Sequence, residues 1–306
     1  MNKEQFREER LKKEKRCGSG IIDLKNRTLY VENIPFLYDF FKQLLIKSGI
    51  YQKWHDNALA VRIRHKSWSF ANLPESFDSF RILHISDLHI DSLPELAQIL
   101  PQLMQAVEYE LCVFTGDFRF NIHCEEMRID HLLRPIIERA NQASYPALAV
   151  LGNHDYLDYT QENVEKAGLK FLYNESLDIQ KGNDRILITG LDDVHYYRTG
   201  RLFDQRRQIK KADFKILLVH SPEYYREAAL YNYDLYLCGH THGGQLCLPG
   251  GLPVISNSRS SQRFIRGRWH YKRMEGYTSA GAGSSGIPLR WNCPPEITVH
   301  HLWRKK

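Results

Sequence analysis

The sequence predicts an α/β fold in which short apolar strands alternate with amphipathic helices, preceded by an N-terminal helical extension. Residues 93–108 and 125–142 repeat apolar side chains at helical spacing, and each segment precedes an apolar run typical of a buried strand. The chain has 306 residues, 42% of them hydrophobic, which is enough to bury a sizeable core. We therefore expect one principal domain over residues 56–306 and an extension over residues 1–55.

The extension combines a basic stretch with an amphipathic segment. Residues 11–16 (LKKEKR) are predicted to form a solvated, partly disordered terminus. Residues 34–51 space their aromatic and aliphatic side chains as a helix with an apolar stripe requires. Most such helices pack on their own domain, but the preceding basic stretch also suits peripheral attachment to a membrane. Residues 57–65 then alternate apolar and basic side chains, which predicts a strand with one solvated face.

Side chains that can bind metals stand at the ends of five strand-like runs. The runs cover residues 80–91, 111–118, 147–156, 214–222 and 234–238. The side chains at or just beyond their carboxyl ends are Asp87, His89, Asp117, Asn153, His154, Asp155, His220, His240 and His242. Residues two apart in an extended segment share a face, so His240 and His242 are expected to point the same way. The same spacing predicts a shared face for Asp87 and His89. Residues 185–193 predict a further strand.

This arrangement predicts a ligand site at one edge of the sheet. Any single pattern has a structural explanation, because an aspartate after a glycine is a common turn and an asparagine before histidine and aspartate can cap a helix. Five coincidences at strand ends instead indicate a shared site, since loops converge there in α/β proteins. Imidazole, carboxylate and amide ligands without a thiolate suit manganese, iron or zinc better than calcium or magnesium.

These motifs, in this order, resemble the complete motif set of the calcineurin-like metallophosphoesterases. The set consists of Asp87-Leu88-His89, Gly116-Asp117, Gly152-Asn153-His154-Asp155, His220 and Gly239-His240-Thr241-His242, and it spans residues 80–245. The rest of the chain, through residues 248–251 (LPGG) and 293–302 (CPPEITVHHL), is similar to a bacterial, phosphodiesterase-like branch of that family. The resemblance implies a sandwich of two packed mixed β-sheets flanked by helices.

The resemblance also implies a centre of two divalent metal ions. One ion would be bound by Asp87, His89 and His242, and the other by Asn153, His220 and His240, with Asp117 bridging both. Two cations about 3.5 to 4 Å apart can share the hydroxide that attacks the phosphorus and can neutralise charge on the phosphoryl oxygens. His154 is left to protonate the leaving oxygen, with Asp155 holding its tautomer, although a purely electrostatic role for His154 fits equally well.

The implied function is that of a metal-dependent hydrolase that cleaves a phosphodiester or a pyrophosphate, with lipid-linked or nucleotide substrates as options. A phosphomonoesterase or nucleotide phosphatase is the alternative, because substrate choice depends on the shape of the loops. A non-catalytic scaffold is disfavoured, since the ligand set is complete. Two further residues are candidate substrate contacts. Arg119 could reach a phosphate or form a surface ion pair, and His195 could line the pocket.

Charge and hydropathy predict the kind of partner and the compartment of the protein. The net charge of +6 is mild and its acids are interspersed with bases, so the sequence does not indicate a nucleic-acid partner. No apolar stretch approaches the ~20 residues of a membrane span and the N-terminus lacks a signal-peptide pattern, which predicts the cytoplasm. Gly281, Gly283 and Gly286 match a dinucleotide fingerprint in spacing only, so we expect a loop beside the metal centre. The sequence predicts no oligomeric state.

Overall fold

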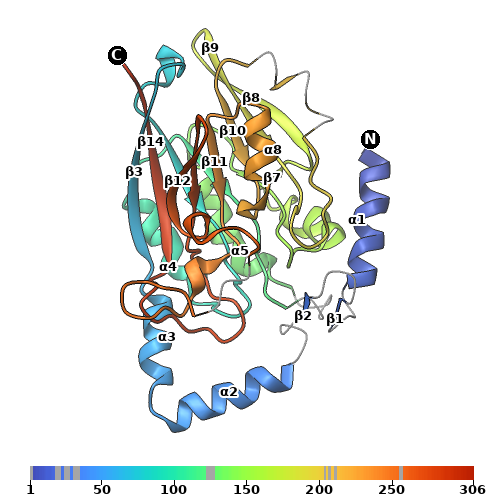
Figure 1. Ribbon diagram of the computed structural model, residues 1–306, viewed down its shortest axis with the longest axis vertical. Helices are drawn as coiled ribbons and strands as arrows, with labels where there is room; N and C mark the ends of the chain where they lie inside the picture. The colour runs from blue at the N-terminus through green and yellow to red at the C-terminus, as the bar shows by residue number, and fades with distance from the viewer. Residues whose placement is uncertain are drawn as a thin grey trace.

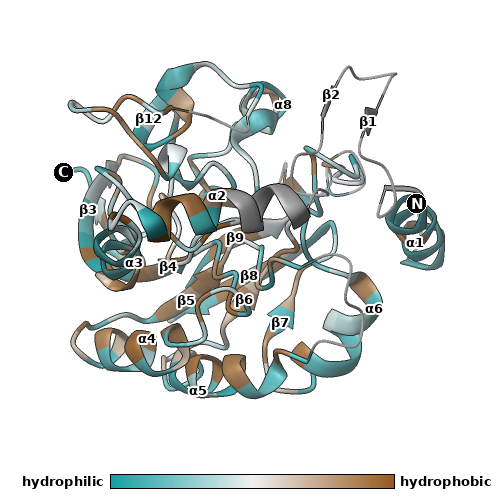
Figure 2. Cartoon of the chain, turned by 90° about the horizontal axis from the view of Figure 1, so that it is seen from below, coloured by the Kyte–Doolittle hydropathy of each residue, from teal (hydrophilic) through white to brown (hydrophobic). Residues whose placement is uncertain are grey.

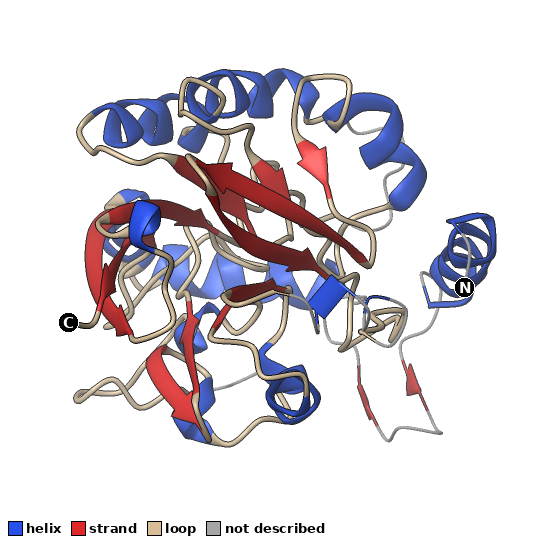
Figure 3. Ribbon diagram, turned by 90° about the horizontal axis from the view of Figure 1, so that it is seen from above, coloured by secondary structure: helices blue, strands red, loops and turns tan. Residues whose placement is uncertain are grey.

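The computed structural model confirms the predicted fold class, with two six-stranded mixed sheets packed on each other and flanked by helices (Figure 1). It describes residues 3–17, 22–23, 28–29, 35–121, 128–202, 205, 208–209, 212–254 and 258–306. Seen from above, the strands occupy the middle of the molecule and a row of helices runs along one side (Figure 3).

The first sheet has the order β3-β14-β4-β5-β6-β7. Its strands are β3 (Arg62–Phe70), β14 (Glu296–Arg304), β4 (Phe80–Ile85), β5 (Leu111–Phe114), β6 (Leu148–Ala149) and β7 (Lys170–Phe171). Strands β4 to β7 are parallel, while β14 runs antiparallel to β4 and parallel to β3. The carboxyl ends of β4, β5 and β6 therefore lie at one edge of this sheet.

The second sheet has the order β12-β13-β11-β10-β9-β8. Its strands are β12 (Gly267–Tyr271), β13 (Met274–Thr278), β11 (Leu235–Cys238), β10 (Lys215–Leu218), β9 (Asp184–Gly190) and β8 (Glu175–Lys181). The four central strands are parallel, and β8 and β12 pair antiparallel with them at the two edges. This topology gives the second sheet its own edge of carboxyl ends, formed by β10 and β11.

The core lies in layers because the central strands are buried on both faces. In β4, Ile82 faces the other sheet, whereas Leu83 and Ile85 face the helices. Apolar side chains from both sheets fill the layer between them: Ile82, Val113, Leu148, Ile188, Ile216 and Leu237. This layer fixes the two sheets against each other and so holds their carboxyl ends together.

Helices α4 (Leu96–Gln105) and α5 (Asp130–Ala140) lie side by side on the outer face of the first sheet (Figure 2). Both confirm predicted helices with shorter bounds, and the predicted residues 125–127 lie outside the described part of the chain. The remaining short helices are α6 (Leu157–Tyr159), a π turn (Thr160–Val164), α8 (Tyr225–Leu230) and 3₁₀ turns at Glu75–Phe77, Pro222–Tyr224, His242–Gly244 and Gln262–Phe264.

The N-terminal part contains α1 (Lys3–Cys17), the short pair β1 (Ile22–Asp23) and β2 (Thr28–Leu29), α2 (Pro35–Lys47) and α3 (Tyr51–Leu59). The predicted amphipathic helix is confirmed as α2, which lies beneath the sandwich in Figure 1, but it ends at Lys47 and not at residue 51, because the chain turns at Gly49 (φ 73°) and Tyr51 begins α3. The predicted start of the next strand at residue 57 is wrong, because α3 continues to Leu59 with Ala58 buried. Strand β3 begins only at Arg62.

Three apolar side chains in the second half of α2, where the structure describes side chains, are exposed. Phe41, Leu44 and Ile46 are 46%, 55% and 45% exposed, so these side chains do not bury themselves in the principal domain. Within the described residues, no helix is both long and apolar enough to cross a bilayer. Helix α1 also differs from the prediction, because part of the basic stretch expected to be solvated is helical and Glu14 within it is buried.

Candidate metal centre

The predicted metal-binding side chains meet where the carboxyl ends of the two sheets come together. They follow β4, β5 and β6 of the first sheet and β10 and β11 of the second. The structure gathers them into two buried groups, Asp87, His89 and His242 in one and Asp117, His220 and His240 in the other. Within each group, the atoms that could bind a metal all lie within 4.8 Å of one another.

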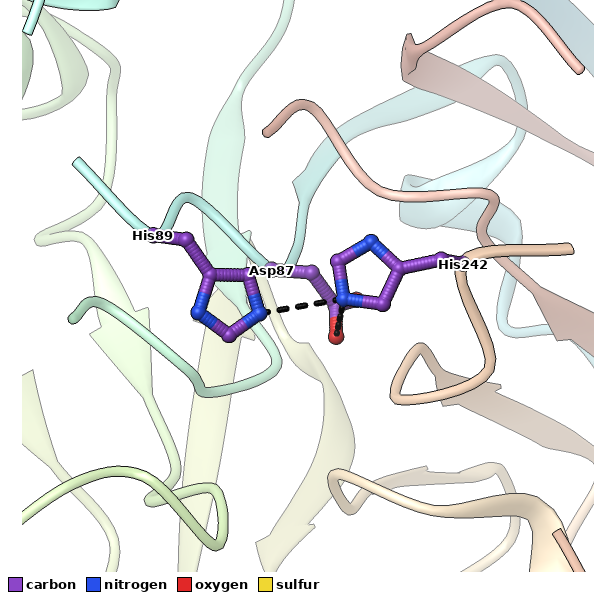
Figure 4. Close-up of side chains that lie close together, drawn as sticks. All are labelled: Asp87, His89 and His242. Carbon is purple, nitrogen blue, oxygen red and sulfur yellow. Dashed lines mark hydrogen bonds and ion pairs between the residues drawn. The ribbon is translucent and has the colours of Figure 1, made fainter. Parts of the chain in front are cut away.

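The first group presents two imidazole nitrogens to each other (Figure 4). Nε2 of His89 lies 3.0 Å from Nε2 of His242, which is 3.6 Å from Oδ1 of Asp87. The carbonyl oxygen of Arg119, 3.0 Å from Nδ1 of His89, accepts the proton of that nitrogen and leaves Nε2 with a lone pair. Burial lowers the pKa of His89 to about 4, so this ring is neutral near pH 7.

The second group converges on Nε2 of His220. This nitrogen lies 3.2 Å from Oδ2 of Asp117, 3.1 Å from Oδ1 of Asn153 and 3.2 Å from Nδ1 of His240. Nδ1 of His220 donates to the carbonyl oxygen of Thr115 at 2.7 Å. Oδ2 of Asp117 is also 3.6 Å from Nε2 of His89. A single carboxylate oxygen therefore faces both groups.

The protonation of the second group fits a cation site. Burial lowers the pKa of His220, but the Asp117 carboxylate outweighs this effect and raises it to about 10. Burial likewise raises the pKa of Asp117, but His220 and His154 outweigh it and hold that pKa well below its usual value. The proton on Nε2 of His220 thus lies among three acceptor atoms, Oδ2 of Asp117, Oδ1 of Asn153 and Nδ1 of His240. A divalent cation is a suitable replacement for it, because nitrogen and oxygen ligands without thiolates suit manganese, iron and zinc.

The backbone around the ligands corrects the predicted extended geometry. Strands β4 and β11 end at Ile85 and Cys238, before the motifs begin. Positive φ values follow at Asp87 (52°), His89 (40°), Asp117 (56°), His240 (72°) and His242 (50°). His240 and His242 consequently reach different groups instead of sharing a face. The carboxylate of Asp87 accepts from the backbone N–H of His240 at 2.9 and 3.0 Å, and so ties the two loops together.

Glycines beside the ligands allow this close approach. A Cβ on Gly239 would lie 2.1 Å from Oδ2 of Asp87, and one on Gly152 would lie 2.1 Å from Oδ1 of Asp117. The glycine-rich segment is a loop against the centre, as predicted, since the N–H of Gly283 donates to the carbonyl oxygen of Asp87 at 2.8 Å. Each of these contacts leaves no room for a side chain.

The prediction that Asp155 holds the tautomer of His154 is wrong. The Asp155 carboxylate accepts from three backbone N–H groups, those of Gly152, Asp117 and Phe118, at 2.8 to 2.9 Å. Nδ1 of His154 instead lies 2.6 Å from the carbonyl oxygen of Phe120, which fixes the tautomer. Asp155 therefore fixes the loops that carry Asp117 and His154, because the turn after β6 aims its carboxylate at backbone and not at the ring.

Two supporting sets of residues were not predicted. Arg290 is fully buried and donates to the carbonyl oxygens of His242 at 2.9 Å and Ala280 at 2.7 Å. A buried chain of contacts links Trp68, His300, His84, Thr115 and Ser86, at 3.0, 3.4, 2.8 and 2.7 Å. Burial lowers the pKa of His84 to about 3, so this ring acts as a neutral link. These residues come from distant segments without a local motif.

The two predicted substrate contacts occupy different surroundings. Arg119 is 1% exposed, with its guanidinium 5.4 Å from the ring centre of Tyr156 and 5.3 Å from that of Tyr159. Its burial excludes the alternative of a surface ion pair. Nδ1 of His195 lies 2.8 Å from Oε1 of Glu223, and its ring is centred 4.3 Å from that of His240. His195 therefore stands at the border of the second group.

Comparisons with known proteins agree with this geometry. The family model of the calcineurin-like phosphoesterases matches residues 80–244. The metallophosphoesterase YkuE of Bacillus subtilis is 31% identical over 245 residues, which cover 75% of this chain and 81% of YkuE. The phosphodiesterase YaeI of Escherichia coli is 29% identical (78% and 87% covered). The UDP-2,3-diacylglucosamine pyrophosphatase LpxG of Chlamydia trachomatis is 24% identical (78% and 88% covered). The chain belongs to the calcineurin-like phosphoesterases and is a metal-dependent phosphoester hydrolase.

Proposed function

We propose that the protein hydrolyses a phosphodiester or a pyrophosphate at a centre of two divalent cations. The observation that carries this proposal is the position of Asp117, whose Oδ2 is 3.2 Å from Nε2 of His220 and 3.6 Å from Nε2 of His89. A carboxylate that faces two groups of ligands suits a pair of neighbouring cations. The names of two relatives, a phosphodiesterase and a pyrophosphatase, support the same classes of substrate.

The proposed ligands divide as the two groups do. Asp87, His89 and His242 would hold one cation, and Asn153, His220 and His240 the other, with Asp117 shared between them. When bound, the two cations would neutralise charge on the phosphoryl oxygens and make a water acidic enough to supply the nucleophile at neutral pH. Manganese, iron and zinc all suit these ligands, and manganese is our first choice for the experiments.

His154 is the proposed proton donor to the leaving oxygen. The carbonyl oxygen of Phe120 accepts from Nδ1, so Nε2 is the nitrogen that would carry the transferred proton. The proton at Nε2 is then available to the leaving group. Asp155 contributes by fixing the backbone at Gly152 and Asp117. Contacts of Arg119 and His195 with the substrate belong to the same proposal.

Hydrolysis of bis(p-nitrophenyl) phosphate and p-nitrophenyl phosphate, measured side by side, tests this function. Protein stripped of metal should be inactive, and manganese should restore turnover with a preference for the diester. Separate additions of iron, zinc and magnesium then rank the metals by the turnover that each supports. A preference for the monoester would favour the alternative of a phosphomonoesterase or nucleotide phosphatase. Turnover that survives complete removal of metal would contradict a metal-dependent mechanism.

A lipid-linked or nucleotide substrate is the finer part of the proposal. The exposed apolar side chains of α2 suit contact with a membrane surface, where a lipid phosphate would lie. LpxG is named for a nucleotide-linked diacyl sugar, which combines both kinds of substrate. Peripheral attachment through α2 would bring such a molecule to the protein without a membrane-spanning segment.

Flotation with vesicles of phosphatidylglycerol and phosphatidylcholine tests the attachment. Leu44→Asp should reduce the floating fraction about 10-fold or more, because it removes an exposed leucine that the bilayer would bury and adds a charge there. Leu230→Asp, at the end of α8, is the matched control, since Leu230 is 71% exposed and α8 lies far from α2 in Figure 1. Equal flotation of the two variants, or no flotation of the wild-type protein, would remove the support for a membrane contact.

A further inference from the structure

The N-terminal helix α1 reaches the back of the loop that carries Asn153 and His154. Arg10 of α1 is fully buried, 142 residues away in sequence from Gly152. Its Nη2 donates to the carbonyl oxygen of Gly152 at 3.3 Å and to that of Asp155 at 2.7 Å. These two carbonyls stand on either side of Asn153 and His154. One nitrogen of Arg10 therefore holds both ends of this short loop.

The guanidinium of Arg10 is fixed by its other contacts. Nε donates to Oε1 of Glu14 at 2.7 Å, and Nη1 donates to both carboxylate oxygens of Asp192 at 3.1 and 3.3 Å. Its central carbon stands 3.7 Å over the ring of Tyr197. The buried charge is thus paired and stacked, which is the condition under which a protein interior tolerates it. Because these three contacts fix the guanidinium, its position determines where the carbonyl oxygens of the loop can lie.

Glu14 extends the same contact by one turn of α1. Its Oε1 accepts from the backbone N–H of Leu157 at 3.0 Å, where α6 begins. The loop from Gly152 to Leu157 is consequently held from behind at three backbone groups by two side chains of α1. On its front, the N–H of His154 donates to Oδ1 of Asp117 at 2.9 Å. The loop is fixed between α1 and the carboxylate that faces both ligand groups.

We propose that Arg10 is a positioning residue that sets the loop of Asn153 and His154, and so places Asn153 for the second metal group. This inference rests on the proposed function, because Asn153 matters here as a ligand beside His220. Oδ1 of Asn153 lies 3.1 Å from Nε2 of His220, and a loop displaced by a fraction of that distance would no longer complete the group. A lysine cannot replace Arg10 fully, since one ammonium lacks the planar fork that meets two carboxylates and two carbonyls.

The first metal group has supports of its own. Asp87 accepts from the N–H of His240, His89 donates to the carbonyl oxygen of Arg119, and Arg290 donates to the carbonyl oxygen of His242. None of these contacts involves α1. Loss of Arg10 should therefore weaken one of the two cations selectively, and this selectivity distinguishes positioning from a general loss of stability.

Manganese titration of the full-length protein, with free ion measured by electron paramagnetic resonance, tests the proposal. We expect wild-type protein to bind two ions, and Arg10→Met and Arg10→Lys to bind one ion normally and the other about 10- to 100-fold more weakly. Saturating manganese should restore much of the kcat that is lost at low manganese. Arg10→Lys keeps the charge among Glu14 and Asp192, so it remains informative if Arg10→Met does not fold.

Arg7→Met is the matched control, because Arg7 lies on the same helix in an exposed ion pair with Asp158. It should bind both ions as the wild-type protein does. Arg10→Lys with two unchanged affinities, or with both affinities reduced equally, would overturn the role of Arg10 and leave the proposed function intact. Wild-type protein that binds no manganese and cleaves no phosphoester would overturn the proposed function as well.

Discussion

Asp117→Asn should lower kcat for bis(p-nitrophenyl) phosphate by about 10³-fold or more at saturating manganese. Oδ2 of Asp117 lies within 3.6 Å of imidazole nitrogens from both groups, those of His89 and His220. An amide of the same size keeps the shape but removes the negative charge between two cations. Stabilisation by paired metals is worth several kcal/mol in the transition state, and each 1.36 kcal/mol changes the rate tenfold.

The same titration of bound manganese should show that Asp117→Asn holds fewer than two ions at concentrations that fill the wild-type protein. Asp178→Asn is the matched control, because Asp178 lies on β8 in an exposed ion pair with Arg185. This variant should keep full turnover and two ions. If Asp117→Asn retained wild-type turnover while metal-stripped protein was inactive, the shared role of Asp117 would be refuted.

His154→Gln should lower kcat by about 10²- to 10⁴-fold for substrates with poor leaving groups. Its ring stands close to the first group, with its centre 5.0 Å from that of His89, and it is fixed by Phe120. An alkoxide needs a proton to depart, whereas p-nitrophenolate departs readily without one. The loss should therefore be small for p-nitrophenyl esters and should grow with the pKa of the leaving alcohol.

A series of aryl and alkyl diesters measures this dependence as a slope of log kcat against leaving-group pKa. A steeper slope for His154→Gln than for the wild-type protein would identify His154 as the acid. An equal loss across the series would show the electrostatic role instead. His154→Gln should bind two manganese ions as the wild-type protein does, because no proposed ligand is altered.

The site was predictable where local sequence and topology act together. An apolar run of four to six residues that ends in a glycine, an aspartate or a histidine predicts both a buried strand and the place of the polar side chain after it. Strands β4, β5 and β11 follow this rule, and it correctly brings Asp87, Asp117 and His240 to one place. The packing of two sheets came from the resemblance to a family, because strand periodicity does not specify which sheet a strand joins.

Other features depend on contacts that no local pattern encodes. Arg10 precedes a run of charged residues typical of a solvated terminus, and only its contacts with Asp192 and the loop at Gly152 show that it is buried. Asp155 was assigned to His154 because they are neighbours in sequence, but the turn directs its carboxylate to backbone N–H groups. The sequence did not predict strands β12 and β13, because apolar and polar side chains alternate only weakly in them and β13 contains Gly276.

The positive φ values at the ligand positions cost folding free energy, so stability and catalysis favour different residues there. Each non-glycine residue with positive φ costs about 1 kcal/mol or more, and Asp87, His89, Asp117, His240 and His242 all carry it. Their sum is comparable with the whole stability of an ordinary domain, about 5 to 15 kcal/mol. Laboratory evolution for heat resistance alone should therefore accumulate glycine or asparagine at these positions and discard catalysis first. Screens for robust variants of this enzyme need to select for turnover in every round.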